Sequence, residues 1–212
     1  MVLLKDTFHL EQMEWFDRPR YNIAPGQLLM AISQENGKRT LSQWKWGLIP
    51  SWAKDNRSSY SSFNAKSETV FDKPMFRVPV RKHRCLIPAD GFYEWKKSGN
   101  AKQPMRIVIQ DRPIFAFAGI FDVWKDPEGN SLHTVSILTT SPNELMQDIH
   151  DRMPVILTRE AEAFWLDQDI QERSALEPLL TPYPAEQMQA YPVSMVVNNA
   201  RNDVTACIEP LT

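Results

Sequence analysis

Short apolar runs separated by turn-forming residues constrain the fold of this chain more than any other feature. Runs at 28–32, 105–109, 114–120 and 135–138 are each bounded by Pro, Gly, Asn or Asp. Such runs are typical of β-strands joined by turns. Asp111-Arg112-Pro113 and the segment 126–130 are turn signals between runs that we expect to pair. The sequence therefore predicts a mainly β structure.

Helical patterns are expected only at a few places. The segment from Asp6 to Phe16 indicates a short amphipathic helix, and Ser141-Pro142-Asn143-Glu144 indicates a capped helix start. Thr158 is expected to begin another short helix. No internal repeat, low-complexity tract or linker stands out. We therefore predict an α+β fold, mainly β, in which residues 1–212 form a single domain.

Charge and cysteine content narrow the function classes. The net charge is −2 and the sequence pI is about 6.1, so nucleic-acid binding would require a local basic patch. The stretch 77–102 supplies one candidate patch, for which the simpler interpretation is a solvated basic face. Cys85 and Cys207 lie in neither a CxxC nor a Cys/His metal spacing, so we expect no metal and no cofactor. The chain also has no run of about 18 apolar residues, so we expect no membrane partner and a cytoplasmic location.

Two segments carry side chains suited to acid/base chemistry. Glu94 lies among Phe92, Tyr93 and Trp95, and loss of hydration there is expected to raise its pKa. His150 lies beside an acid and an arginine, as a proton-transfer group would. Simpler interpretations remain open: Glu94 as an ion-pair partner on a strand, and His150 as a histidine at a helix end. Asn64 is likewise interpreted as a turn-capping amide or as a catalytic one.

Read in order, five motifs resemble those of the SOS response-associated peptidase (SRAP) family. They lie at Tyr21 to Pro25, Trp46 to Trp52, Asn64 to Glu68, Pro88 to Trp95 and His150 to Pro154. The resemblance spans nearly the whole chain. It implies a curved antiparallel sheet with a barrel-like core and a few short helices.

The resemblance also implies a function. Family members bind single-stranded DNA and form a thiazolidine cross-link to abasic sites through a cysteine that follows the initiator methionine. In that chemistry Glu94 would assist ring opening of the sugar, His150 would act as general acid/base, and Asn64 would hydrogen-bond the nucleophile or the sugar. The implied DNA-binding residues are Pro25, Trp46, Trp52, Lys66, Arg77 and Arg81. The expected partner is single-stranded DNA containing abasic sites, bound by a monomer that is nucleoid-associated when on DNA.

Two departures from the family pattern bear on this reading. Lys66 stands where the family usually has arginine, so charge is kept but the bidentate fork is lost. The chain begins Met1-Val2, where the family begins Met-Cys-Gly-Arg-Phe. We expect that truncation has removed the first strand and the nucleophile, because Asn64, Glu94 and His150 are all retained. Two alternatives are a cysteine-type (auto)peptidase of the SOS response and a non-catalytic single-stranded DNA-binding module.

Overall fold

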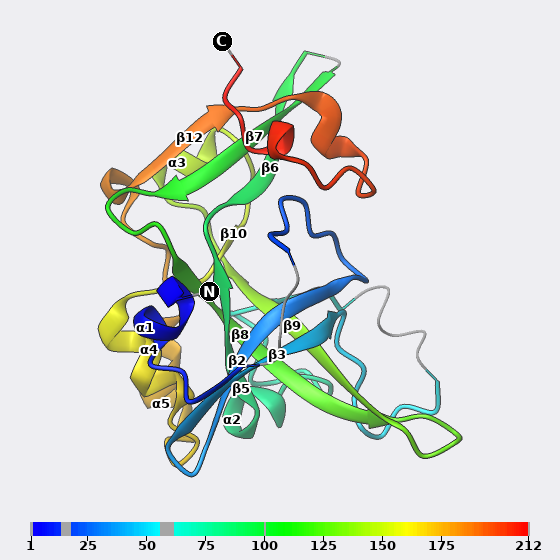
Figure 1. Ribbon diagram of the computed structural model, residues 1–212. Coiled ribbons are helices and arrows are strands. Elements are labelled where there is room, and N and C mark those ends of the chain that lie inside the picture. Colours follow the sequence, from blue (N-terminus) through cyan, green and yellow to red (C-terminus); the bar gives the residue numbers. More distant parts are fainter. Residues whose placement is uncertain (1, 14–17, 56–61, 100, 212) are drawn as a thin grey trace.

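The core of the protein is a closed barrel of five strands (Figure 1). The computed structural model describes residues 2–13, 18–55, 62–99 and 101–211. In barrel order the strands are β3 (Lys38–Trp46), β2 (Leu28–Glu35), β5 (Arg84–Ala89), β8 (Phe115–Lys125) and β9 (Ser131–Thr140). These neighbours pair antiparallel. The barrel closes where β3 pairs with β9 in parallel, with Lys45 opposite Thr134 and Trp46 opposite Val135.

Local sequence explains the hairpins of the barrel. Asn36 and Gly37 join β2 to β3 with φ angles of 49° and 77°, the left-handed pair that a tight hairpin turn requires. Along β5, Leu86 joins one core cluster while Cys85 and Ile87 join another. Because successive side chains of a strand point to opposite faces, the barrel wall is packed on both sides.

A second, smaller sheet stands at one end of the barrel, at the top of Figure 1. It has the order β12 (Met188–Pro192), β7 (Ala101–Ile109), β6 (Phe92–Ser98). A third apolar cluster holds the C-terminal segment against this sheet, with Val193, Val197 and Cys207 packed against Tyr93 and Trp95. Strand β6, which carries Glu94, is thereby held on the face that Tyr93 and Trp95 share.

Short elements complete the fold. The two-to-three-residue strands are β1 (Gln12–Met13) beside β3, β4 (Asn64–Lys66) and β10 (Met153–Pro154) beside β9, and β11 (Ile156–Leu157) beside β8. The helices are α1 (Val2–Phe8), α2 (Pro79–Lys82), α3 (Glu144–Gln147), α4 (Arg159–Leu166) and α5 (Arg173–Leu176). Within the described ranges, none of these helices is long and apolar enough to cross a membrane. The prediction of a mainly β, α+β fold with a barrel-like core is confirmed.

Candidate functional site

Glu94 and His150 meet at the junction between the small sheet and the barrel. Glu94 lies on β6 opposite Met105 of β7, and His150 lies in the turn between α3 and β10. The His150 Nε2 atom is 3.9 Å from Glu94 Oε2. The Glu94 side chain is 23% exposed and that of His150 is 42% exposed, so the imidazole remains open to solvent while the carboxyl group is largely covered.

Burial dominates the electrostatics of Glu94. Desolvation raises the pKa of this carboxyl group, and the nearby His150 only partly opposes the effect. The expectation of a raised pKa at Glu94 is therefore confirmed. On His150, Nδ1 lies 3.1 Å from the backbone nitrogen of Arg152, 3.2 Å from the Arg152 carbonyl oxygen and 3.2 Å from Asp151 Oδ1, while Nε2 faces Glu94. At 3.9 Å the imidazole and the carboxyl group are neighbours beyond direct hydrogen-bonding distance, so both face the same space, where a substrate could contact each of them.

Strand β4 presents two of the predicted site residues on one face. Asn64 and Lys66 are exposed, while Ala65 between them is fully buried. The strand pairs in parallel with β9, with Asn64 opposite Ile137 and Lys66 opposite Thr139. This pairing directs the amide and the ammonium group outward at the end of β9 where β10 also pairs.

A carboxylate–guanidinium pair at this end was not predicted from the sequence. Arg152 donates to both carboxylate oxygens of Glu68, at 2.6 and 2.9 Å, and to the carbonyl of Thr139 at 2.7 Å. The hydrogen bond from Arg152 lowers the pKa of Glu68. Lys66 pairs in register with Thr139, whose carbonyl Arg152 contacts, so β4 and the Arg152–Glu68 pair lie at the same end of β9. Glu68 lies in the motif from Asn64 to Glu68, and Arg152 lies in the motif from His150 to Pro154. Their membership in these two motifs was the feature of the sequence that could have pointed to them.

The Pro25 turn is linked to Asn64 through Trp46. Ala24-Pro25-Gly26-Gln27 forms a tight turn in which the Gln27 N–H donates to the Ala24 carbonyl and Gly26 has a φ of 89°. The Gly26 N–H donates to the Trp46 carbonyl at 2.8 Å. The indole N–H of Trp46 in turn donates to the carbonyl of Phe63, the residue before Asn64, at 2.9 Å. Trp46 is half-buried, and a stacking role for it stays a prediction.

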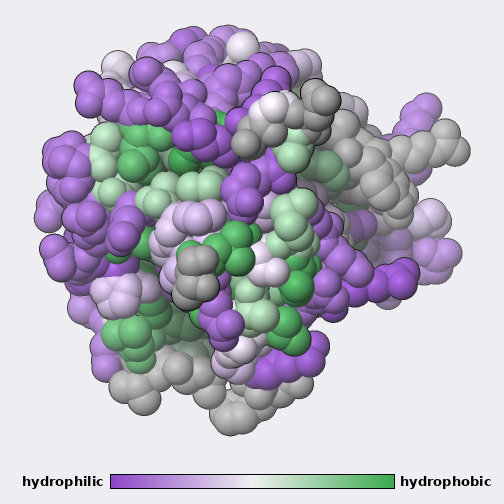
Figure 2. Space-filling model, turned by 90° about the horizontal axis from the view of Figure 1, so that it is seen from above, coloured by the Kyte–Doolittle hydropathy of each residue, from purple (hydrophilic) through white to green (hydrophobic). Residues whose placement is uncertain are grey.

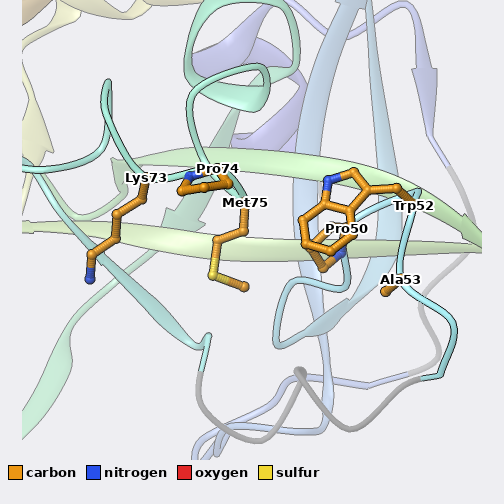
Figure 3. A pocket seen from close by; sticks show the side chains of 6 residues that line it. All are labelled: Pro50, Trp52, Ala53, Lys73, Pro74 and Met75. Atoms are coloured by element: carbon orange, nitrogen blue, oxygen red, sulfur yellow. The ribbon is translucent and has the colours of Figure 1, made fainter.

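Trp52 lies on a firmly held loop. The backbone N–H of Ser51 donates to Asp122, and the indole of Trp124 donates to the carbonyl of Ala53, both at 2.8 Å. Trp52 is nevertheless 68% exposed. It borders a hollow of about 270 Å³ whose opposite wall is 73–75 (Figure 3). A fixed backbone under an exposed indole provides a platform for a flat ligand.

The Trp52 platform is separated from the acid/base pair. The 49–53 loop is anchored at the start of β9, where Ile49 bonds Thr134, and Lys66 pairs at Thr139. Five residues of strand correspond to about 17 Å. The hollow is lined by Pro50, Trp52, Ala53, Lys73, Pro74 and Met75, and includes neither Glu94 nor His150.

Arg77 and Arg81 lie away from this site. They belong to the α2 region, at the end of the barrel opposite the small sheet (Figure 1). Arg81 donates to the carbonyl of Gln171 at 2.9 Å and lies 5.5 Å from the centre of the Phe71 ring. Arg77 is exposed. The structure thus does not bring these two arginines to Glu94 and His150, and their role toward phosphates stays a prediction.

The two cysteines of the chain are poorly placed for nucleophilic chemistry. Cys85 and Cys207 are both fully buried. Burial raises the pKa of the Cys85 thiol, so its thiolate is disfavoured. Within the described part of the chain, no group of three or more His, Cys, Asp and Glu side chains is arranged to hold a metal ion.

Comparisons with known proteins identify the family of the chain and relatives of the same fold. The model of the SOS response associated peptidase (SRAP) family matches residues 3–200. The abasic site processing protein YoqW of Bacillus subtilis (strain 168) is 47% identical over 207 residues, which cover 96% of this chain and 92% of YoqW. The abasic site processing protein HMCES of Gallus gallus is 34% identical over 238 residues, which cover 95% of this chain and 70% of that protein. A crystal structure of a protein from Bacteroides thetaiotaomicron superimposes with a TM-score of 0.80 at 34% identity, covering 88% of this chain and 82% of that one.

Proposed function

Because this chain belongs to the SOS response associated peptidase (SRAP) family, we propose that it binds single-stranded DNA and senses abasic sites there. The observation that carries the proposal is the Glu94–His150 pair, with 3.9 Å between Nε2 and Oε2. An abasic sugar offers a hemiacetal that must open to an aldehyde, and opening moves one proton onto the ring oxygen and another off the hydroxyl. A carboxyl group with a raised pKa and a neighbouring imidazole suit these transfers.

The surroundings of the pair support an anionic, single-stranded partner. The exposed Lys66 would meet a phosphate, and the exposed Trp52 would stack on a base farther along the strand. Stacking requires an unpaired base, so this arrangement favours single-stranded over duplex DNA. We propose that the protein acts as a monomer.

The covalent step requires a group that position 2 of this chain does not carry. In the family chemistry, an α-amine attacks the aldehyde, water leaves to give a Schiff base, and the neighbouring thiol adds to the C=N bond to close a thiazolidine. Position 2 here is Val2. The cross-linking test therefore uses a version in which cysteine follows the initiator methionine and is exposed when that methionine is removed.

The binding test compares four oligonucleotides by fluorescence anisotropy: single-stranded and duplex DNA, each with and without one abasic site. We expect the tightest binding to single-stranded DNA with the abasic site. The affinity should fall as salt rises, because phosphate contacts release counterions. Equal affinity for all four oligonucleotides would contradict the proposal.

The peptidase alternative is tested on the same preparations. The version carrying the N-terminal cysteine is incubated with abasic single-stranded DNA and, separately, with an unfolded protein substrate. A heat-stable DNA adduct without cleavage of the protein substrate is the expected result. Cleavage without any adduct would favour the peptidase.

A further inference from the structure

Three lysines gather at the tip of the β6–β7 hairpin. Lys97 pairs in register with Lys102, and Lys96 pairs with Gln103. All three lysines are exposed. Strand β12 pairs with β7 only from Met105 to Ile109, so the tip extends past the small sheet at the top of Figure 1. The tip is therefore a positively charged projection.

This concentration of charge is unfavourable by itself. Like charges directly opposite each other on paired strands destabilise the pairing. Among the residues that the structure describes, no ion pair involves Lys96, Lys97 or Lys102. An anion bound from outside the chain would relieve the repulsion.

The tip continues β6, the strand that carries Glu94. Lys96 lies two residues beyond Glu94 on the same face of β6, which corresponds to about 7 Å. Lys97 shares the other face with Trp95, whose indole N–H is held by the Asn198 side chain at 2.7 Å. A strand of DNA leaving Glu94 along β6 would thus pass these ammonium groups.

We propose that Lys96, Lys97 and Lys102 form a second phosphate-binding segment for single-stranded DNA, contacting nucleotides on one side of the abasic site. The inference rests on the proposed function and extends it to residues at the tip. The basic stretch 77–102 is thereby divided into two separate groups. The three lysines lie on the β6–β7 hairpin, whereas Arg77 and Arg81 belong to the α2 region at the other end of the barrel (Figure 1). The DNA would follow β6 away from the barrel rather than run toward α2.

Figure 2 views the molecule from the end that carries the small sheet. Apolar residues lie in several groups across the middle and lower part of this face, interspersed with hydrophilic residues, and hydrophilic residues cover its upper part. In the C-terminal segment, Met195 is 54% and Val204 49% exposed. Such a face provides both apolar surface for bases and polar surface for a backbone, as single-stranded binding requires.

The lysines have a competing explanation. Strand β6 is an edge of the small sheet, and lysines on edge strands prevent association with other chains. That role needs positive charge but no DNA. The two explanations differ in what neutralising the lysines does to the salt dependence of DNA binding.

The test uses the double variant Lys97→Gln/Lys102→Gln. Its control is Lys38→Gln/Lys82→Gln, which removes the same charge from exposed lysines far from the hairpin. Binding to a long single-stranded oligonucleotide with a central abasic site is measured between 50 and 200 mM salt. Two lost phosphate contacts should reduce the log–log salt slope by about 1.4, so the wild-type chain should lose about sevenfold more affinity than the variant over this range.

A second pair of oligonucleotides locates the contact. Each extends from the abasic nucleotide in only one direction. We expect the double variant to weaken binding of one of the two and to leave the other unchanged, and Lys96→Gln to act on the same one. The control variant should match the wild-type chain on both.

The outcomes separate this inference from the function on which it rests. If the wild-type chain does not bind abasic single-stranded DNA, the proposed function fails, and this inference fails with it. If the wild-type chain binds but the hairpin variant keeps its salt slope and its affinity for both one-sided oligonucleotides, this inference alone is wrong. Self-association of the variant with unchanged DNA binding would likewise overturn it, in favour of edge protection.

Discussion

At the residue scale, Glu94 shows how a carboxyl group is prepared for proton transfer. Burial raises its pKa, so the acid form persists to higher pH than in an ordinary glutamate. In the version with an N-terminal cysteine, we expect Glu94→Gln to slow cross-link formation by about 100-fold or more while DNA affinity stays unchanged. Single-turnover rates and anisotropy measure the two effects. Equal losses of rate and affinity would indicate a binding role instead.

The raised pKa of Glu94 also fixes the direction in which the stability of the fold changes with pH. Because the pKa is higher in the folded than in the unfolded chain, the folded state holds the proton more tightly. The free energy of unfolding therefore falls as pH rises through the interval between the two pKa values. Above that interval Glu94→Gln should unfold at a higher temperature than the wild-type chain. Thermal melts near pH 4 and pH 8 test this, and a variant less stable at both pH values would contradict it.

The properties of a single residue could be predicted from the sequence when they depend on its neighbours along the chain, and not when they depend on residues far away in sequence. The direction of the Glu94 pKa shift was predictable from its apolar neighbourhood, but the cause was only partly so: of the three flanking aromatic residues, only Phe92 shares its face of β6, and Tyr93 and Trp95 point to the other. The pairing of Arg152 with Glu68 was not predictable, because it depends on β4 and β10 both lying beside β9. The basic stretch at 77–102 appeared to be one patch only because sequence proximity ignores the length of β5 between its two halves.

At the element scale, Arg84 holds β5, α2 and α4 together. Its side chain is fully buried and donates to the carbonyls of Trp165 at 2.6 Å and Val80 at 3.2 Å, and also to those of Arg81 and Asp167. Burial lowers its pKa to about 10. We expect Arg84→Lys to destabilise the fold by about 2 to 4 kcal/mol, because an ammonium group cannot reach all four carbonyls.

Chemical denaturation measures the loss at Arg84. The matched control is Arg77→Gln, an exposed arginine just before the same helix, for which we expect a change of about 0.5 kcal/mol or less. If Arg84→Lys were as stable as this control, the four carbonyl contacts would contribute little.

The element boundaries show why helices were harder to predict than strands. Thr158 caps α4 as expected, accepting from the Ala161 N–H at 3.3 Å. At α3 the cap is Asn143 rather than Ser141, because Asn143 Oδ1 accepts from Met146. The helix expected from Asp6 to Phe16 lies instead at Val2–Phe8, and 14–17 are outside the described residues. Short helices depend on tertiary packing, which sequence periodicity does not reveal.

Of the two turns expected between paired strands, the one at 126–130 does join paired strands, β8 and β9. The turn at Asp111–Pro113 instead joins β7 and β8, which lie in two different sheets.

At the scale of the whole molecule, hydrogen bonds join the first third of the chain to its last residues. The Asn22 amide donates to the carbonyls of Val197, Asn199 and Asn202, at 3.0 to 3.3 Å. Asp203 accepts from the backbone N–H groups of Tyr21 and Asn22, and pairs with Arg20. These contacts hold the Pro25 turn next to the C-terminal segment that packs on Trp95.

Asp203 should make this junction sensitive to acid. Partial burial opposes the shift, but hydrogen bonds from the Tyr21 and Asn22 backbone and from Arg20 hold the pKa of Asp203 below its usual range. Its contribution to stability is therefore present above the unfolded value of about 3.9 and is lost as pH falls through the folded value. Asp203→Ala should lose this contribution, and amides at 20–27 should exchange faster with deuterium. Unchanged exchange in that segment would contradict the expected junction.

The closure of the barrel by β3 and β9 has a consequence for how the protein acquires its structure. Lys45 of β3 pairs with Thr134 of β9, two residues that are far apart in sequence. The barrel therefore cannot close until β9 has been synthesised. Contacts that distant in sequence make folding slow compared with helical domains of similar size. On the ribosome, the early β2–β3 hairpin must wait for β5 on one edge and for β9 on the other, and that interval is when the nascent chain is most exposed to aggregation.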